Sequence, residues 1–157
     1  MILRPTKTGD VKTDKALDEI REELRVKKAV VRAYWWASND LSTASGDRYM
    51  TPGWTGVSNV ERGLIPMTAS GRLRRLAVNQ VTAGTGAATL SFVLRVNKKD
   101  TLIEVSFPNT STGVFISKMD LEVPVKAGDE VGICVRKTAV LTAASTAVVA
   151  SLEFVED

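Results

Sequence analysis

Apolar residues recur at every second position through most of this chain, and this alternation limits the fold more than any other feature. Leu90, Phe92 and Leu94 share one side of a run, while Ser91 and Arg95 take the other. A period of two is typical of a half-buried β-strand, because successive side chains point to opposite faces of a sheet. The larger part of the chain is therefore predicted to be β-structure.

A turn-like stretch separates this run from a second one. Asn97–Asp100 (NKKD) leads into Ile103, Val105 and Phe107, which alternate with Leu102, Glu104 and Ser106. Two alternating runs on either side of a short polar connection are typical of an antiparallel hairpin. We expect a hairpin here with a four-residue connection.

Further short strands are expected on both sides of the hairpin. They are predicted at residues 29–36, 72–81, 115–123, 131–135 and 148–154. Seven or eight short strands, separated by turn residues and without helical crossovers, indicate an all-β fold. We predict an antiparallel jelly-roll-type sandwich, with residues 37–68 forming a long ordered surface loop that contains one short strand.

The N-terminal residues follow a different pattern. Residues 1–12 carry Pro5 and Gly9 without apolar periodicity, which favours an extended arm that is ordered only when something binds it. The chain is therefore divided into an N-terminal arm and helix, residues 1–28, and a β-sandwich domain, residues 29–157.

The helix of this N-terminal part is expected over residues 13–28. Leu17, Ile20 and Leu24 fall at helical spacing among charged residues, so the apolar stripe is narrow. So short a helix is marginal alone, and it must dock on its own domain or pair with copies of itself. These three residues are candidate oligomer contacts.

The residue types needed for common catalytic chemistry are scarce. The chain has no histidine and one cysteine, Cys134, which removes histidine-based nucleophile activation and zinc sites built on several cysteines. Four carboxylates could still meet in space as a hydrolase site: Asp47, Glu61, Glu104 and Asp120. We expect a protein that is not an enzyme and that needs no cofactor or metal, with Cys134 as a buried structural thiol.

Charge and hydropathy narrow the partners. The formal net charge is +3, which gives little support to a nucleic-acid role. No apolar run is long enough to cross a bilayer, and residues 1–10 lack the apolar core of a signal peptide. We expect a soluble protein made in the cytoplasm, without a membrane partner.

Tryptophans are the most unusual feature of the composition. Trp35 and Trp36 are adjacent in a predicted strand, so they must face opposite sides of the sheet. Both could be covered by the domain's own loops, or they could lie at a subunit interface or stack on carbohydrate. Trp35 and Trp36 are candidate oligomer contacts, and Trp54 is a candidate partner-binding residue.

Arginines gather in one predicted strand. Arg72, Arg74 and Arg75 could form a basic partner-binding patch with Lys98 and Lys99. Exposed charges on strand faces also simply keep a β-surface soluble, and this alternative stays open.

The second half of the chain resembles virion jelly-roll proteins of tailed bacteriophages and, more distantly, the trimeric tumour-necrosis-factor and C1q-like fold. The resemblance is carried by residues 70–73 (SGRL), the turn at 97–100 and residues 125–131 (VKAGDEV), within a match covering about 68–157. It implies a compact homotrimer that packs inner strands at a threefold axis.

The same resemblance implies a role in a virion. We expect a capsid decoration or cement protein that stabilises a phage head and contacts the major capsid protein or another virion protein. The alternative is a receptor- or glycan-binding module of a tail or spike, which would need exposed aromatic residues such as Trp54 or Trp36 in a groove.

Overall fold

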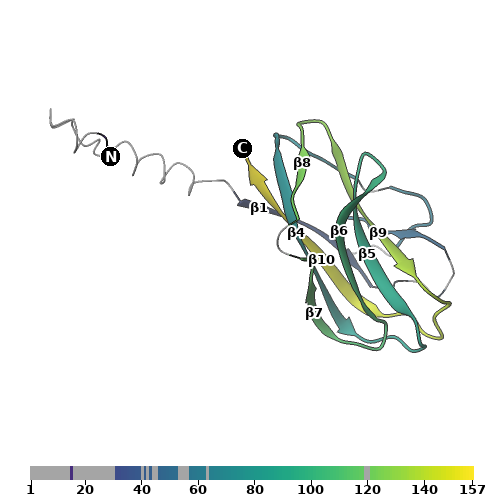
Figure 1. The fold of residues 1–157 in the computed structure, drawn as a ribbon. Helices are drawn as coiled ribbons and strands as arrows, with labels where there is room; N and C mark the ends of the chain where they lie inside the picture. Colours follow the sequence, from purple (N-terminus) through teal and green to yellow (C-terminus); the bar gives the residue numbers. More distant parts are fainter. Residues whose placement is uncertain are drawn as a thin grey trace. The chain divides into compact units, whose positions relative to one another are not determined.

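In a computed structural model, the described residues are 15, 31–39, 41, 43, 46–52, 57–62, 64–118 and 121–157. Their strands form two antiparallel sheets, which Figure 1 shows as the two layers of a sandwich. The predicted all-β antiparallel sandwich is confirmed. The predicted arm and helix, with Leu17, Ile20 and Leu24, lie outside the described residues.

Sheet A is built around three long strands. They are β1 (Val31–Ser38), β10 (Thr146–Glu156) and β4 (Gly71–Thr82), in that order. Two short strands, β7 (Gly113–Ile116) and β8 (Val123–Val125), both pair with the far side of β4. Pro124 lies in β8, at an edge of the sheet, where the missing N–H of a proline is tolerated.

Sheet B has a matching arrangement. Its long strands are β9 (Glu130–Lys137), β5 (Thr89–Val96) and β6 (Lys99–Pro108). Two short strands, β2 (Arg48–Tyr49) and β3 (Ile65–Pro66), both pair with β9. The region predicted to hold one short strand therefore holds two in its described part.

The chain passes from one sheet to the other between most successive strands. The first strand, β1, pairs with the last, β10, and β2 pairs with β9. Between them, β4 returns to sheet A before the β5–β6 hairpin, and β7 and β8 return to it afterwards. This wrapping, in which strands distant in sequence are neighbours, is that of a jelly roll.

The alternating side chains fill the space between the sheets. The strands bury Leu76 and Val78 from β4, Leu90, Phe92 and Leu94 from β5, Ile103, Val105 and Phe107 from β6, Val131, Ile133 and Val135 from β9, and Val148, Ala150, Leu152 and Phe154 from β10. Phe107 stacks on Phe92 with ring centroids 5.5 Å apart. Burial of these groups is the main favourable term in the fold.

The predicted hairpin is present, but its connection is shorter than expected. Val96 pairs with Lys99, so only Asn97 and Lys98 form the turn. Both adopt positive φ, 51° and 64°, as a two-residue turn compatible with strand twist requires. The four-residue connection is therefore wrong, since Lys99 and Asp100 already belong to β6.

A bulge interrupts the pairing of β4 with β10. Arg75 pairs with Glu153, but Leu73 pairs with Phe154, so β4 carries one extra residue, Arg74, at this point. A bulge shifts the alternation of side chains by one position. Its effect on the arginines is described below.

Polar groups close one end of the core. The buried Gln80 donates hydrogen bonds to the carbonyl oxygens of Asn109, at 2.8 Å, and Ser111, at 2.6 Å. Asn109 is itself buried and donates to the carbonyl oxygen of Thr85. Ser145 donates to the Asn109 side-chain oxygen. These bonds connect four segments at the point where the strands end.

Candidate functional site

The outer face of sheet A is apolar across its middle. One row of register partners crosses the sheet as Trp35, Ser151, Ala77 and Ile116. Because neighbouring strands lie about 4.8 Å apart, this row spans roughly 14 Å. Within it, Trp35 and Ile116 are exposed, while Ser151 and Ala77 are small and leave the surface flat.

Exposed apolar side chains concentrate on this face. Of the eight large ones in the described part of the chain, five belong to sheet A: Val31, Trp35, Val81, Val114 and Ile116. Single exposed apolar residues are ordinary, but a contiguous group on one face marks an interaction surface. We call these five residues the apolar face.

The two adjacent tryptophans differ in burial. Trp36 is completely buried in the core, whereas Trp35 is 68% exposed. Trp36 therefore has no surface to offer another chain, which corrects its place among the candidate oligomer contacts. It also removes Trp36 as a glycan-stacking residue, and Trp54 lies outside the described residues.

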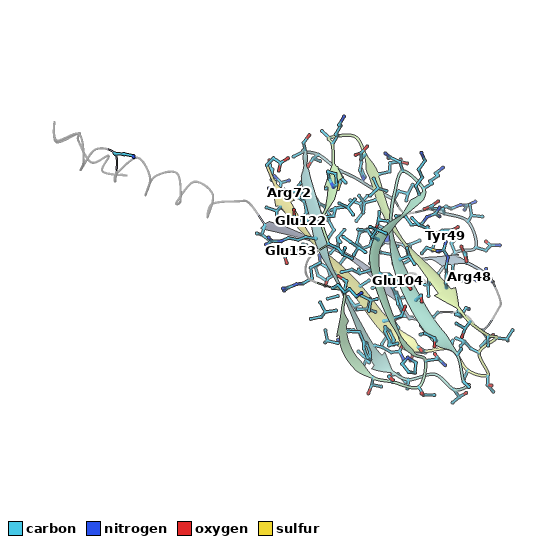
Figure 2. The ribbon with its side chains drawn as sticks, viewed as in Figure 1. Arg48, Tyr49, Arg72, Glu104, Glu122 and Glu153 are labelled. Carbon is cyan, nitrogen blue, oxygen red and sulfur yellow. The ribbon has the colours of Figure 1, made fainter. Side chains whose placement is uncertain are left out.

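The predicted arginine patch is paired with acidic residues. Arg74 donates to Glu153 at 2.5 Å, and Arg75 approaches the other oxygen of the same carboxylate at 3.9 Å. Arg72 contacts Glu122 at 3.3 Å and Asp157 at 3.3 Å. Figure 2 shows Arg72, Glu122 and Glu153 gathered in one region of sheet A. The site is therefore a mixed-charge cluster.

The bulge in β4 explains why this cluster holds consecutive arginines. Strict alternation would send Arg74 and Arg75 to opposite faces of the sheet. Because Arg74 is the extra residue of the bulge, Arg74 and Arg75 both reach Glu153, a residue of the outer face. Lys98 lies in the β5–β6 turn and Lys99 begins β6, both in the other sheet, so they are not part of this group.

A shallow depression lies within the cluster. It has a volume of about 200 Å³ and is lined by Arg74, Arg75, Glu122 and Glu153. Small-molecule sites usually occupy roughly 300–1,000 Å³ and are mostly apolar. The depression is smaller and charged, so it suits one side chain of a partner better than a whole ligand.

The outer face of sheet B is covered over β9 and β5 by the chain's own residues, whereas Leu102 of β6 stays exposed. We call Asp47–Pro52, 57–62 and Leu64–Pro66 the covering segment. Tyr49 lies 5.4 Å from the Arg95 guanidinium, and a Cβ built on Gly132 would come within 2.6 Å of Leu64. Sheet B therefore offers no apolar face like that of sheet A within its described part.

Ion pairs hold the covering segment in place. Glu61 pairs with Arg95 at 3.0 Å, and Asp47 pairs with Arg136 at 3.2 Å. Asp100 contacts both arginines, at 3.0 and 2.7 Å. The hydrogen bond from Arg136 is the largest of the effects that hold the pKa of Asp100 below its ordinary value. This chain of alternating charges joins strands β5, β6 and β9 to the segment above them.

Cys134 is confirmed as a buried thiol. It lies in β9 beside Tyr49 of β2. Burial, followed by the nearby charge of Asp47, raises its pKa to about 12. Since the thiolate is the reactive form, this cysteine is a poor nucleophile in the folded protein.

The carboxylates considered for hydrolysis have other partners. Asp47 and Glu61 are bound to arginines, and Glu104 accepts a hydrogen bond from Ser106. Asp120 lies outside the described residues. Among the residues that the structure describes, no group of three or more potential ligands is placed to hold a metal ion. In the same residues, no helix has the length and apolar character needed to span a bilayer.

Four residues of the apolar face were missed by the sequence interpretation: Val31, Val81, Val114 and Ile116. A signal was present, because Val114 and Ile116 flank Phe115 in a strand that is apolar at every position after its glycine. Such a strand carries apolar side chains on both faces, a pattern that is typical of strands buried on both faces.

Comparison with known proteins gives limited information. No family model matches the chain, and no curated protein matches it. Among solved structures, it is similar to murine APRIL in a crystal structure at pH 5.0, a protein with the tumour-necrosis-factor type of fold. The identity is 14%, the TM-score is 0.38, and the match covers 78% of this chain and 99% of that chain. The jelly roll is established here by the chain's own strand order.

Proposed function

We propose that this protein is a non-enzymatic structural component of a virion, which decorates or cements a phage capsid as a homotrimer. The observation that carries a structural role is the apolar face of sheet A, which none of the described segments covers. The virion setting rests on the sequence resemblance described above. The protein would be made in the host cytoplasm and then added to the particle.

The mechanism would be multivalent surface burial without bond chemistry. Trimer formation would cover the apolar face, because removing apolar surface from water favours association. Three linked copies could then bind the major capsid protein or another virion protein together. Simultaneous contacts raise the effective affinity well above that of one copy.

The tail- or spike-module alternative has less support. It needs an exposed aromatic groove, and of its two aromatic candidates Trp36 is buried. The arginine cluster is balanced by glutamates, which does not favour a nucleic-acid partner. A structural role is therefore the function that the described surfaces support best.

Self-association is tested by light scattering on the full chain. We expect a mass of three times the 17.0 kDa chain, and a shift towards monomer when Val114 and Ile116 are both changed to Asp. The matched control is Leu102→Asp, which changes the exposed Leu102 of sheet B. A monomeric wild-type protein at all concentrations would contradict the trimer.

Decoration is tested separately by co-sedimentation. The full chain is added to purified phage capsids that lack it, and the pelleted protein is quantified together with the melting temperature of the capsid. We expect saturable binding and a higher melting temperature. A trimer that neither pellets with capsids nor stabilises them would rule out decoration while leaving self-assembly intact.

A further inference from the structure

The charged depression and Trp35 lie on the same face of the same sheet. Trp35 is opposite Ser151 in β10, and Glu153, which lines the depression, is two residues further along that strand. The apolar face and the charged depression are thus continuous. A partner molecule that binds the apolar face would therefore also approach the charged depression.

The depression has the chemistry to receive an aromatic ring. Both Arg74 and Arg75 are turned towards Glu153, which restricts where their guanidinium groups can lie. A guanidinium is planar and weakly hydrated, so it stacks on aromatic rings, and tryptophan is the best acceptor of such cation–π contacts. Glu122 and Glu153 supply carboxylates at the rim that can accept an indole N–H.

Trp35 is the aromatic side chain that needs such a place. It is 68% exposed, and the described residues of its own copy do not cover it. Within the described part of the chain, the cation–π contact is made by Arg95, which lies over the ring of Tyr49. A buried tryptophan at the centre of an interface is among the largest contributors to binding energy.

We propose that Trp35 of one copy occupies the depression formed by Arg74, Arg75, Glu122 and Glu153 on a neighbouring copy of this chain. The inference rests on the self-association proposed above and names its central contact. The proposed homotrimer requires this contact to be heterologous, with each copy donating Trp35 to one neighbour and receiving the Trp35 of the other, so that the contacts close into a ring. The apolar residues Val81, Val114 and Ile116 would form the surrounding contact that excludes water.

The first test compares dissociation constants of full-length variants by analytical ultracentrifugation. We expect Trp35→Ala to weaken association roughly 30-fold or more, as hot-spot tryptophans do. Arg74→Lys with Arg75→Lys keeps the charges and the partners of Glu153 but removes the planar stacking surface, so a smaller loss of roughly 3–10-fold is expected. The control Leu102→Ala should stay close to wild type.

The second test is complementation between variants. Trp35→Ala lacks the ring, and Arg74→Ala with Arg75→Ala lacks the receptor, so neither can form the contact alone. In a mixture, the tryptophan of the second variant can enter the depression of the first. We expect a mixed species that is heavier than either variant by itself at the same concentration.

The outcomes separate this contact from the proposed function. If Trp35→Ala associates like wild type, or if the mixture is no heavier than its components, the contact is wrong although self-assembly stands. If wild-type protein is monomeric throughout, the self-assembly proposal fails and this contact fails with it. If the double alanine variant does not fold, judged by circular dichroism, the lysine variant decides, and association equal to wild type overturns the proposal.

Discussion

The two sheets have similar strand arrangements but different outer faces. Sheet B is covered over β9 and β5 by its own chain, with arginines of these strands bound to acidic residues of the covering segment, while the outer side of β6 is exposed. Sheet A carries exposed apolar residues that no described segment covers, next to a cluster of paired charges. The outer face of sheet B is thus covered, over β9 and β5, within a single chain. The outer face of sheet A is suited to being covered by a neighbouring molecule.

The two adjacent tryptophans allow the most direct test of the difference between a core residue and a surface residue. Trp36→Ala should lower the free energy of unfolding by about 3–5 kcal/mol, because it leaves a cavity in the core. Trp35→Ala should change it by less than about 0.5 kcal/mol in protein diluted until it is monomeric. Urea denaturation of both variants measures this. Equal losses would mean that Trp35 also packs within its own chain.

The ion pairs of the two faces should differ in strength. The side chains of Arg95 and Glu61 are only 13% and 12% exposed, so Arg95→Ala would leave a poorly hydrated carboxylate and cost about 2–4 kcal/mol. Arg72 is about half exposed, and Arg72→Ala should cost less than about 1 kcal/mol. Unfolding curves at low and high salt test this. Similar losses of stability for Arg95→Ala and Arg72→Ala would mean that the ion pair of Arg95 with Glu61 does not hold the covering segment in place.

Adding one or two carbon atoms to each outer face probes whether that face is covered. Gly132→Ala places a methyl group within 2.6 Å of Leu64, so Leu64 must move, at a cost of about 1–2 kcal/mol. Ala77→Val adds bulk to the middle of the uncovered sheet and should change stability by less than about 0.5 kcal/mol in the monomer. Thermal melts would reveal the difference, and a neutral Gly132→Ala would indicate a loosely held covering segment.

Acid should weaken the network over sheet B. The pKa of Asp100 is lowered in the folded protein, mainly by Arg136, so its carboxylate stabilises the fold above the ordinary value of 3.8. That contribution is lost as the pH falls below 3.8 through the lowered pKa. Wild type should exceed Asp100→Asn by less than about 1 kcal/mol at neutral pH, and the difference should vanish in acid. A constant difference down to about pH 2 would contradict this.

Sequence periodicity predicted the fold class because alternation directly reports which side of a strand is buried. It placed the hairpin and the buried sides of β5, β6 and β10 correctly. It did not give the turn length, because Asn97 is of a residue type that favours positive φ but Lys98 is not, and the two-residue turn requires positive φ at both. Strand order likewise depends on contacts between residues far apart in the chain.

The candidate site was predicted only in part, for a related reason. The sequence showed that two neighbouring tryptophans face opposite ways, but not which one is buried. It also grouped Arg72, Arg74 and Arg75, but their glutamate partners come from other segments, and the bulge that aligns Arg74 with Arg75 is a property of the pairing with β10. Neither can be seen in a local pattern.

The pairing of the first strand with the last has a consequence for synthesis. Arg32 and Glu156, which form an ion pair between these strands, are 124 positions apart. A ribosome adding about 5–20 residues per second needs roughly 6–25 s to make that stretch. Throughout that time β1 lacks its partner strand and Trp36 cannot be enclosed. The sandwich can therefore close only after β10 has been made, and until then a newly made β1 exposes an unpaired edge to other nascent chains.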